Sequence, residues 1–313
     1  MPERAGEQAP ARIRELAAQR LAARQARDYA AADRLRAEIA QQGWVVTDTQ
    51  GGYDLVPAVP EAAYEVLPNP SAVTADLASG RSPRSATIGL LVEGWPDDLR
   101  ECVSALLAHA PAGVMISALD VGNRDGAGDA LHELAAEHPA RIEALHVAAS
   151  PGWSAGRNAL LRADPAPVHV IMETSTILTG DAISPLLAAL ADDTVVAAGW
   201  RGADPDPDLQ GFHDAGPGQV TALLGYLLAV RTAAAREAGW LPAGARFYRN
   251  ADLEFSLRLG RSGRLLVPDR SLPVRQARHR GYHDSDPEYR DRESRRNYRL
   301  VLELLRQSGG TPG

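Results

Sequence analysis

Four polar turns follow one another in a fixed order along this chain, and they constrain its fold more than any other feature. The turns begin at Asp120, Gly152, Glu173 and Asp252. Strand-like and helix-like patterns alternate over Thr87–Val92, Asp97–His109, Val114–Leu119, Gly126–Glu137, Ile142–Val147, Ser154–Arg162 and Val168–Met172. This alternation predicts an α/β fold, with a mostly parallel sheet flanked by helices on both faces. Because parallel sheets bind ligands where their strands end, the turns predict a nucleotide-binding site that carries chemistry.

The pattern is less regular after Asp181. We expect a helix, then a strand over Thr194–Ala198, and then a polar loop rich in proline and aspartate over Arg201–Gln219. An apolar stretch follows over Leu223–Val230, and a basic helix is expected over Pro287–Gln307. The α/β domain is therefore predicted to cover 86–308.

The region before this domain has a different character. Residues 10–42 predict two short helices, and apolar segments on either side of Asp48–Gly52 predict a small β-hairpin. Residues 57–85 are rich in proline, alanine and serine, which is typical of a linker. We therefore expect a small module over 1–56, a linker over 57–85 and the α/β domain after it.

The composition excludes several classes of protein. With 33 basic and 40 acidic residues, the formal net charge of −7 argues against broad electrostatic binding to nucleic acid or to an anionic membrane. The single cysteine, Cys102, excludes an internal disulfide and a metal site built from several cysteines. Apolar runs such as Leu223–Val230 are well short of the roughly 20 residues that cross a bilayer. The N-terminal stretch is polar, so we expect a cytoplasmic protein without membrane insertion.

The turn Asp120–Gly126 (DVGNRDG) resembles the Asp-x-Gly-Ser-x-Asp-Gly turn of family 2 glycosyltransferases, which have the GT-A fold. The resemblance covers about Thr87–Arg306 and rests on the order of several motifs. It implies that Asp120 contacts the base or the ribose of a sugar nucleotide. The alternative is that Asp120 only forms an Asx-turn that begins a helix. Glu93 is assigned to the nucleotide by its position at the end of the first strand.

The segment Gly152–Asn158 resembles the Gly-x-x-x-Ala-Arg-Asn segment of the same family, with Gly156 in place of alanine. A helix start that carries Arg157 is a suitable anion site. The resemblance therefore implies that Arg157 pairs with the donor diphosphate. The alternative is a helix capped by Ser154 with Arg157 as a surface residue.

The turn Glu173–Ser175 occupies the place of the family's Asp-x-Asp signature, whose carboxylates hold Mn²⁺ or Mg²⁺ against the diphosphate. Here Glu173 replaces the first acid and Ser175 replaces the second, and serine is a far weaker metal ligand. A metal-independent enzyme is therefore the alternative. His279 and His283 occupy a place where family members often have a histidine that reaches the metal or the diphosphate. They could equally belong to a solvated basic loop.

The segment Asp252–Arg258 (DLEFSLR) resembles the family's Glu-Asp-x-Asp-x-x-x-Arg motif, with Ala251 where the first acid usually lies. The resemblance implies that Asp252 is the base that removes the proton of the acceptor hydroxyl in a single inverting displacement. A carboxylate near two phosphates should have a raised pKa, which suits that role. Glu254 and Arg258 are four residues apart on a helix, so we expect an ion pair that supports the site.

The N-terminal module has a resemblance of its own. Residues 26–36 (ARDYAAADRLR) and 43–49 (GWVVTDT) resemble the C-terminal piece of cysteinyl-tRNA synthetases. The catalytic motifs of a synthetase are absent from this sequence, so the resemblance implies only binding or docking. Arg27, Arg34 and Arg36 are candidates for contacts with tRNA phosphates. Acidic residues alternate with them, so a solvated helical face is the alternative.

Three functions are thus open at the level of sequence. The first is an inverting glycosyltransferase that uses a nucleotide-diphosphate sugar and an unidentified acceptor, which could be a metabolite, a peptide or a glycan. The second is a catalytically inactive GT-A-like protein that binds nucleotide or sugar, and Ser175 and Ala251 favour it. The third is an RNA-associated protein that uses its N-terminal module.

Overall fold

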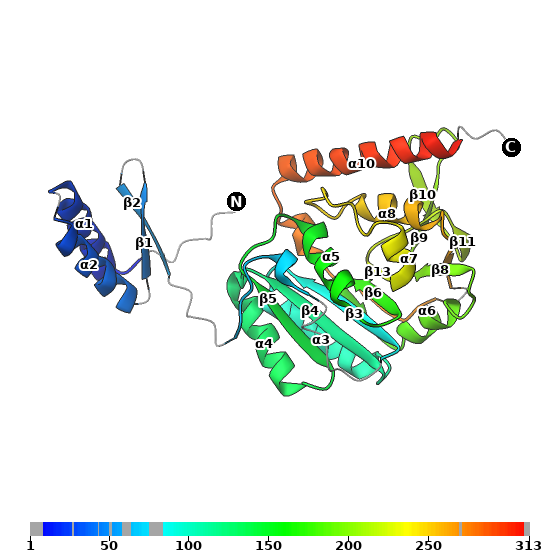
Figure 1. Cartoon of the computed structure of the whole chain (residues 1–313), viewed down its shortest axis with the longest axis horizontal. Helices are drawn as coiled ribbons and strands as arrows, with labels where there is room; N and C mark the ends of the chain where they lie inside the picture. Colours follow the sequence, from blue (N-terminus) through cyan, green and yellow to red (C-terminus); the bar gives the residue numbers. More distant parts are fainter. Residues whose placement is uncertain are drawn as a thin grey trace. The chain divides into compact units, whose positions relative to one another are not determined.

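The chain divides into two compact units, Met1–Tyr64 and Glu65–Gly313, in a computed structural model of the protein (Figure 1). The structure describes residues 9–26, 28–42, 44–49, 52–57, 64–74, 84–268 and 271–309. Arg27 and Gly43, both part of the N-terminal resemblance, lie outside the described residues. In the part of the chain that is described, no helix combines the length and the apolar character needed to cross a membrane.

The first unit is a helical hairpin followed by a β-hairpin. Its elements are α1 (Ala11–Gln25), α2 (Tyr29–Gln41), β1 (Trp44–Thr49) and β2 (Gly52–Pro57). Strands β1 and β2 are antiparallel. Ile13, Leu16 and Ala17 recur at helical spacing and pack with Ile39 and Val46 into a small core.

The second unit is built on an eight-stranded sheet. The strand order is β11-β14-β8-β13-β6-β3-β4-β5. The strands are β3 (Ala86–Val92), β4 (Val114–Val121), β5 (Ile142–Val147), β6 (Val168–Met172), β8 (Val195–Gly199), β11 (Gly218–Val220), β13 (Leu227–Arg231) and β14 (Arg264–Val267). Strands β6, β3, β4 and β5 are parallel neighbours, which confirms the expected mostly parallel sheet.

One central strand departs from this direction. Strand β13 is antiparallel to both of its neighbours, β6 and β8. It comes from the second half of the apolar stretch Leu223–Val230, whose first half contributes to β12 (Ala222–Leu223). Both faces of β13 are covered, which explains why its sequence is almost continuously apolar.

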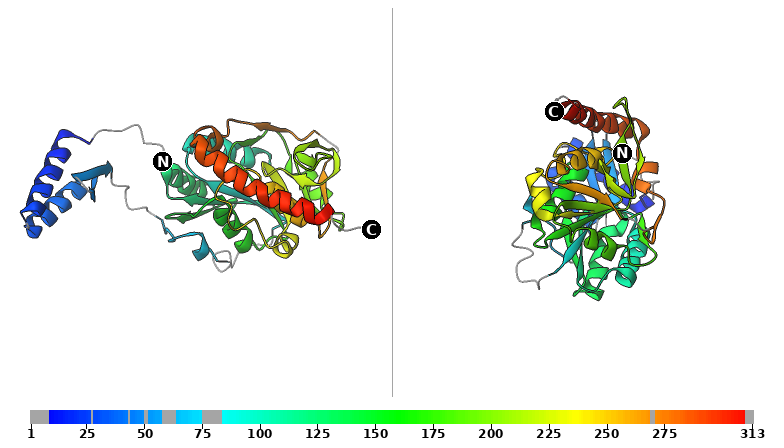
Figure 2. Two further views of the ribbon diagram at one scale, coloured as in Figure 1. Left: turned by 90° about the horizontal axis from the view of Figure 1, so that it is seen from above. Right: turned by 90° about the vertical axis from the view of Figure 1, so that its right-hand side faces the viewer.

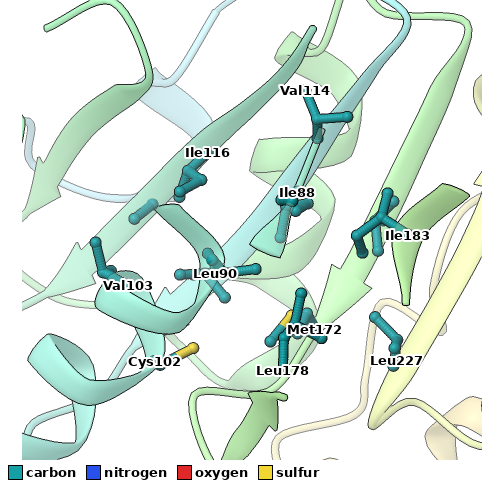
Figure 3. Close-up of a cluster of buried hydrophobic side chains, with 14 of the residues drawn as sticks. Ile88, Leu90, Cys102, Val103, Val114, Ile116, Met172, Leu178, Ile183 and Leu227 are labelled. Carbon is teal, nitrogen blue, oxygen red and sulfur yellow. The ribbon is translucent and has the colours of Figure 1, made fainter. Parts of the chain in front are cut away.

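Helices cover both faces of the sheet (Figure 1). The helices are α3 (Pro96–His109), α4 (Ala127–Glu137), α5 (Trp153–Ala163), α6 (Ile183–Ala189), α7 (Thr232–Glu237), α8 (Ala251–Leu259), α9 (Arg280–His283) and α10 (Pro287–Gly309), with short 3₁₀ turns over Pro70–Ala72 and Arg124–Gly126. Helices α3, α4 and α6 contribute to one apolar core, and α5, α7 and α8 contribute to the other. Figure 3 shows Cys102 among the side chains of the first core, where burial raises the pKa of its thiol to about 12. Cys102 is therefore a small buried apolar residue.

The polar loop expected over Arg201–Gln219 contains strands, and in this the expectation was wrong. Strands β9 (Gly202–Pro205) and β10 (Phe212–Ala215) form an antiparallel hairpin, and β9 also pairs with β12. Asp206 joins them because its backbone N–H bonds the Gly211 carbonyl at 2.9 Å. Prolines and aspartates lie both in the connecting turn and in the strands themselves, such as Asp204 and Pro205 in β9, and this composition hid the two short strands.

Two further segments complete the unit. Helix α10, the red helix of Figure 2, lies beside α8 (Figure 1), and Val301 and Leu305 pack against Leu253. Within the expected linker 57–85, Leu67 pairs with Val147 of β5 in a parallel bridge, and Val73 is buried in the second core. Strands β7 (Thr176–Leu178) and β15 (Val274–Gln276) form a small antiparallel ribbon beside α3.

Candidate active site

Three of the predicted acids lie at one edge of the sheet. Glu93 follows β3, Asp120 is near the end of β4, and Glu173 follows β6. The parallel register pairs Val92 with Asp120 and Leu90 with Met172, so these strands end at the same level. This is the edge at which open α/β sheets bind ligands.

Asp120 is enclosed in its own turn. Its carboxylate accepts the backbone N–H of Asn123 at 3.2 Å and lies 3.4 Å from Nδ1 of His146, and only 2% of the residue is exposed. A side chain at Gly128 would come within 2.6 Å of the Asp120 carboxylate, so only glycine allows the start of α4 to lie this close. Asp125 accepts the backbone N–H of Trp95 and so ties this turn to the loop after β3. The surroundings of Asp120 are therefore those of a turn-forming residue, and its contact with a nucleotide stays a prediction.

Arg157 is buried rather than open to solvent. Its Nη2 lies 3.0 Å from Oε1 of Glu173, and its Nη1 donates to the Gly89 carbonyl at 2.8 Å. The indole N–H of Trp153 donates to the same Glu173 oxygen at 3.3 Å. These contacts fix the Glu173 side chain at the end of β6. Helix α5, which carries both Trp153 and Arg157, can approach β3 because Gly156 leaves no Cβ where one would meet Leu91 at 2.5 Å.

The second oxygen of Glu173 faces His279. Nε2 of His279 lies 3.8 Å from Oε2 of Glu173 and has no hydrogen-bond partner. The imidazole stacks on the ring of Tyr248 with centroids 4.5 Å apart, and its Nδ1 accepts the backbone N–H of Tyr282. His283, by contrast, is exposed and packs edge-on against Tyr282. The structure therefore brings one of the two predicted histidines to Glu173.

Ser175 has a structural partner. Its hydroxyl accepts a hydrogen bond from the Gln276 amide at 2.9 Å, and its backbone oxygen accepts from Ala277. Only 6% of Ser175 is exposed. Ser175 therefore connects the turn after β6 to β15. Its hydroxyl oxygen, the atom that a metal would have to bind, already accepts a hydrogen bond from Gln276.

Asp252 and Glu173 share a cavity of about 190 Å³, which we call the Asp252 cavity. The cavity is lined by Trp153, Glu173, Leu224, Gly225, Tyr226, Tyr248, Arg249, Asn250, Asp252 and Leu253. Asp252 is the second residue of α8, and its Oδ2 accepts the backbone N–H of Gly225 at 2.9 Å. Burial raises the pKa of the Asp252 carboxyl from 3.8 to about 6, and the charge of Glu173 adds to this rise against the opposing backbone hydrogen bonds. Asp252 is thus poised to exchange a proton near neutral pH.

Glu254 and Arg258 form the ion pair that the sequence predicts, farther along α8 than Asp252. Nε and Nη2 of Arg258 donate to the two oxygens of Glu254 at 2.9 and 2.7 Å. Nη2 also donates to the Trp240 carbonyl at 2.7 Å, which anchors α8 to the loop after α7. Ala251 is fully buried in the second core, so the place of the missing acid is apolar.

Glu93 is exposed, yet its charge interacts with that of Glu173. Crowding by protein raises the pKa of the Glu93 carboxyl, and repulsion from Glu173 raises it further, whereas Arg157 and Arg124 lower it. Its position at the end of β3 leaves Glu93 accessible to a ligand at the sheet edge.

The sequence reasoning missed the aromatic residues of the site. Trp153 lies inside the Gly152–Asn158 segment and on the same helix as Arg157, so the sequence could have indicated it as a residue of the site. Tyr226 and Tyr248 belong to no motif, and they reach the cavity from the β12–β13 turn and from the loop before α8. Only the tertiary fold brings them together.

The donor set for a divalent cation is small. In the described part of the chain, no group of three or more His, Cys, Asp and Glu residues is placed to hold a metal ion. Glu173 Oε2 and His279 Nε2 supply one oxygen and one nitrogen, and Ser175 is engaged by Gln276. A cation here would therefore have two protein ligands and would depend on the oxygens of a bound diphosphate for the others.

Comparisons with known proteins identify the fold of the second unit. A mannosyltransferase from Pyrobaculum calidifontis, solved with GDP-Man and Mn²⁺, has a TM-score of 0.53 at 14% identity, over 81% of this chain and 80% of that one. GalNAc-T7, solved with UDP, GalNAc and Mn²⁺, has a TM-score of 0.58 at 15% identity, over 70% of this chain and 48% of that one. The second unit therefore has the GT-A fold. No family model matches it.

The N-terminal resemblance is confirmed at the level of sequence. A cysteine–tRNA ligase from Opitutus terrae is 53% identical over 49 residues, which are 16% of this chain and 11% of the ligase. The chain thus spans only a small part of the length of that ligase. The likeness concerns one short segment and not the activity of the whole enzyme.

Proposed function

We propose that this protein transfers a sugar from a nucleotide-diphosphate sugar to an acceptor hydroxyl, with inversion at the anomeric carbon. The observation that carries the proposal is the Asp252 cavity, where a carboxyl with a pKa of about 6 faces Glu173 on a GT-A fold. A general base works best when its pKa lies near the working pH. The two structural neighbours support the donor class, because they were solved with GDP-Man and with UDP.

In the proposed reaction the Asp252 carboxylate accepts the proton of the acceptor hydroxyl. The acceptor oxygen forms a bond to the anomeric carbon while the bond from that carbon to the diphosphate oxygen breaks. The nucleoside diphosphate leaves with the electron pair of the broken bond. Because attack and departure occur on opposite faces, the configuration inverts, and Asp252 ends protonated.

The donor is proposed to lie over the ends of β3 and β4, with Glu93 and the Asp120 turn beside its nucleoside. Its diphosphate then lies near Glu173 and His279. Burial of Arg157 supports a positioning role for this residue, because its guanidinium holds Glu173 and has 1% exposure. Glu254 and Arg258 are likewise proposed to position Asp252, because they anchor α8.

A divalent cation, where one is used, is proposed to take Glu173 and His279 as its protein ligands. When bound, it would neutralise the leaving diphosphate. His279 is suited to this contact because Tyr248 holds its ring and its Nε2 has no hydrogen-bond partner. Ser175 and His283 have no place in this set.

The first test is a calorimetric titration of the protein with UDP, GDP and dTDP, each with and without Mn²⁺. We expect one nucleotide to bind, and we expect Asp120→Ala to weaken it. A gain in affinity with Mn²⁺ that disappears in His279→Ala would support the cation site. Full affinity and full turnover in EDTA would instead support a metal-independent enzyme. No binding of any nucleotide would contradict the proposal.

Binding without turnover would favour the second interpretation, an inactive GT-A-like protein. Its sequence basis is the loss of two acids, at Ser175 and Ala251. Donor hydrolysis separates the two interpretations, because an active site transfers sugar slowly to water even without an acceptor. We expect hydrolysis in the wild type and a much slower residual hydrolysis in Asp252→Asn, with nucleotide affinity unchanged.

A role in RNA binding rests on a separate observation, the 53% identity of 49 residues to a cysteine–tRNA ligase. Arg34 and Arg36 are exposed on α2 and would face phosphates. Binding of tRNA to the full chain should then weaken in Arg34→Gln/Arg36→Gln. Its affinity should fall with salt by a log–log slope of about −0.9 for each phosphate neutralised. A variant that binds tRNA as the wild type does would contradict this role.

A further inference from the structure

Two arginines lie at the Asp252 cavity: Arg249 lines it, and Arg201 contacts the lining residue Tyr226. Arg201 follows the end of β8, which lies two strands from β6 across β13. Adjacent strands are about 4.8 Å apart, so the backbone of Arg201 is roughly 10 Å from that of Glu173 along the sheet edge. Asp120 and Glu93 are on the opposite side of β6. Arg201 is therefore placed away from the proposed nucleoside.

Aromatic rings hold the Arg201 side chain. Its guanidinium carbon is 4.5 Å from the ring centroid of Trp200 and 6.0 Å from that of Tyr226. Contact with a ring face orients a guanidinium but leaves its N–H groups free to donate in the ring plane. Tyr226 itself lines the cavity, so Arg201 is held at its border.

Arg249 lines the cavity directly. Its Nη1 donates to the Tyr282 hydroxyl at 3.1 Å, and its guanidinium carbon is 5.6 Å from the centre of the Tyr282 ring. The guanidinium carbon of Arg290 also lies over the Tyr282 ring, 4.2 Å from its centre. Arg249 thus approaches the cavity from the α9 side, and Arg201 approaches it from β8.

Neither guanidinium is balanced by an acid. Arg157, Arg258 and Arg264 each form an ion pair with a carboxylate. Across the described ranges, no carboxylate lies within 4 Å of Arg201 or Arg249. Of the two acids of the cavity, Glu173 already pairs with Arg157, so its charge is balanced. When Asp252 is ionised, the charges of Arg201 and Arg249 exceed its single negative charge by one, and the charges of both arginines act on Tyr226.

We propose that Arg201 and Arg249 bind an anionic group of the acceptor, a carboxylate or a phosphate, and so place its hydroxyl at Asp252. This inference rests on the proposed sugar transfer and adds the chemical class of the acceptor. Planar guanidinium groups bind both anions through paired hydrogen bonds. The donor diphosphate is proposed to lie near Glu173 and His279, and Arg201 lies beyond β13, on the other side of β6 from the proposed nucleoside. A second anion, on the acceptor, therefore suits these two arginines.

The test uses three sugars that differ only in the group at C6, which is neutral in glucose and anionic in glucuronate and in glucose 6-phosphate. Each is titrated into the full-length protein, both alone and after saturation with the nucleotide that binds best. We compare wild type with Arg201→Gln, Arg249→Gln and the matched control Arg261→Gln, an exposed arginine beyond the C-terminal end of α8. Turnover of the nucleotide sugar with each probe is measured in parallel.

We expect one or both anionic sugars to bind at least tenfold more tightly than glucose. Arg201→Gln and Arg249→Gln should each remove most of this difference, and Arg261→Gln should leave it unchanged. Preference for glucuronate would identify a carboxylate acceptor, and preference for glucose 6-phosphate a phosphorylated one. Equal affinity for all three sugars, or a preference that survives both substitutions, would overturn the inference.

The same titrations separate this inference from the proposed function. Nucleotide binding with equal affinity for the three sugars overturns the anionic acceptor and leaves sugar transfer standing. Absence of nucleotide binding contradicts sugar transfer, and the titrations without nucleotide then decide the anion site alone. A loss of nucleotide affinity in Arg201→Gln would place this arginine on the donor diphosphate and would also overturn the inference.

Discussion

The Asp120 turn and the Asp252 cavity each present an aspartate predicted from a sequence motif, but the two carboxylates have opposite surroundings. Asp120 is 2% exposed and is engaged by Asn123 and His146. Asp252 is half-buried in a cavity of about 190 Å³, and burial raises its pKa to about 6. A motif therefore identifies a position, whereas access and solvation decide what the side chain does there.

The difference follows from the hydrogen bonds that each fold element offers. The turn after β4 closes on Asp120, so its carboxylate is stabilised as part of the backbone structure. Helix α8 begins at the cavity wall, and the Asp252 carboxylate keeps one side toward the space where an acceptor would lie. We therefore expect substitutions of Asp120 to affect stability more than chemistry, and substitutions of Asp252 to do the reverse.

The largest expected effect is that of Asp252→Asn on sugar transfer. Loss of a general base lowers turnover by about 10²- to 10⁴-fold. The amide keeps the size of the carboxylate and can still accept from Gly225, so nucleotide affinity should be unchanged. Turnover and calorimetry on the same preparation check this. Activity within a factor of three of the wild type would remove Asp252 from the role of base.

Arg157→Met should have the largest effect on stability. Removing one partner of a buried ion pair leaves an uncompensated charge and costs about 3–5 kcal/mol. Urea unfolding measures the loss. The double variant Arg157→Met/Glu173→Gln should recover part of it, because no charge is then left unpaired. A loss in the double variant equal to the sum of the two single losses would contradict the pairing.

Asp120→Ala should destabilise the protein by about 1–3 kcal/mol, the cost of leaving buried polar groups without a partner. The backbone N–H of Asn123 and the ring of His146 lose their shared acceptor. His283→Ala is the matched control, since this exposed side chain lies outside the site and should cost little. Thermal unfolding of both variants tests the comparison. If Asp120→Ala abolishes nucleotide binding without loss of stability, the aspartate faces the ligand instead of its turn.

The sequence predicted the fold class because strand and helix alternation is a local property. Each pattern from Thr87–Val92 to Val168–Met172 can be read without knowledge of the others. The insertion of antiparallel β13 between β6 and β8 could not be predicted, because strand order depends on pairing between distant segments. The same limit applies to β9 and β10, which are short and lie in a polar stretch.

The site was predictable as a set of positions but not as a set of contacts. Motif order indicated Glu173 and Arg157 separately, and the structure shows that they pair. His279 and His283 were equivalent in the sequence, and the stacking on Tyr248 distinguishes them. Tyr226, Arg201 and Arg249 carry no motif, so their approach to one cavity is a property of the fold alone.

The smallest predicted effect is the pH dependence of turnover. It tests whether the surroundings of the Asp252 carboxyl raise its pKa. The base is active when deprotonated, so a pKa raised to about 6 makes kcat/KM fall below pH 6 rather than below the ordinary value of 3.8. The fall should approach tenfold per pH unit, because a single proton is involved. Residual donor hydrolysis by Asp252→Asn should not show this limb between pH 5 and 7. An unchanged limb in that variant would assign the titration to another group, of which Glu93 is the first to test because its pKa is also raised.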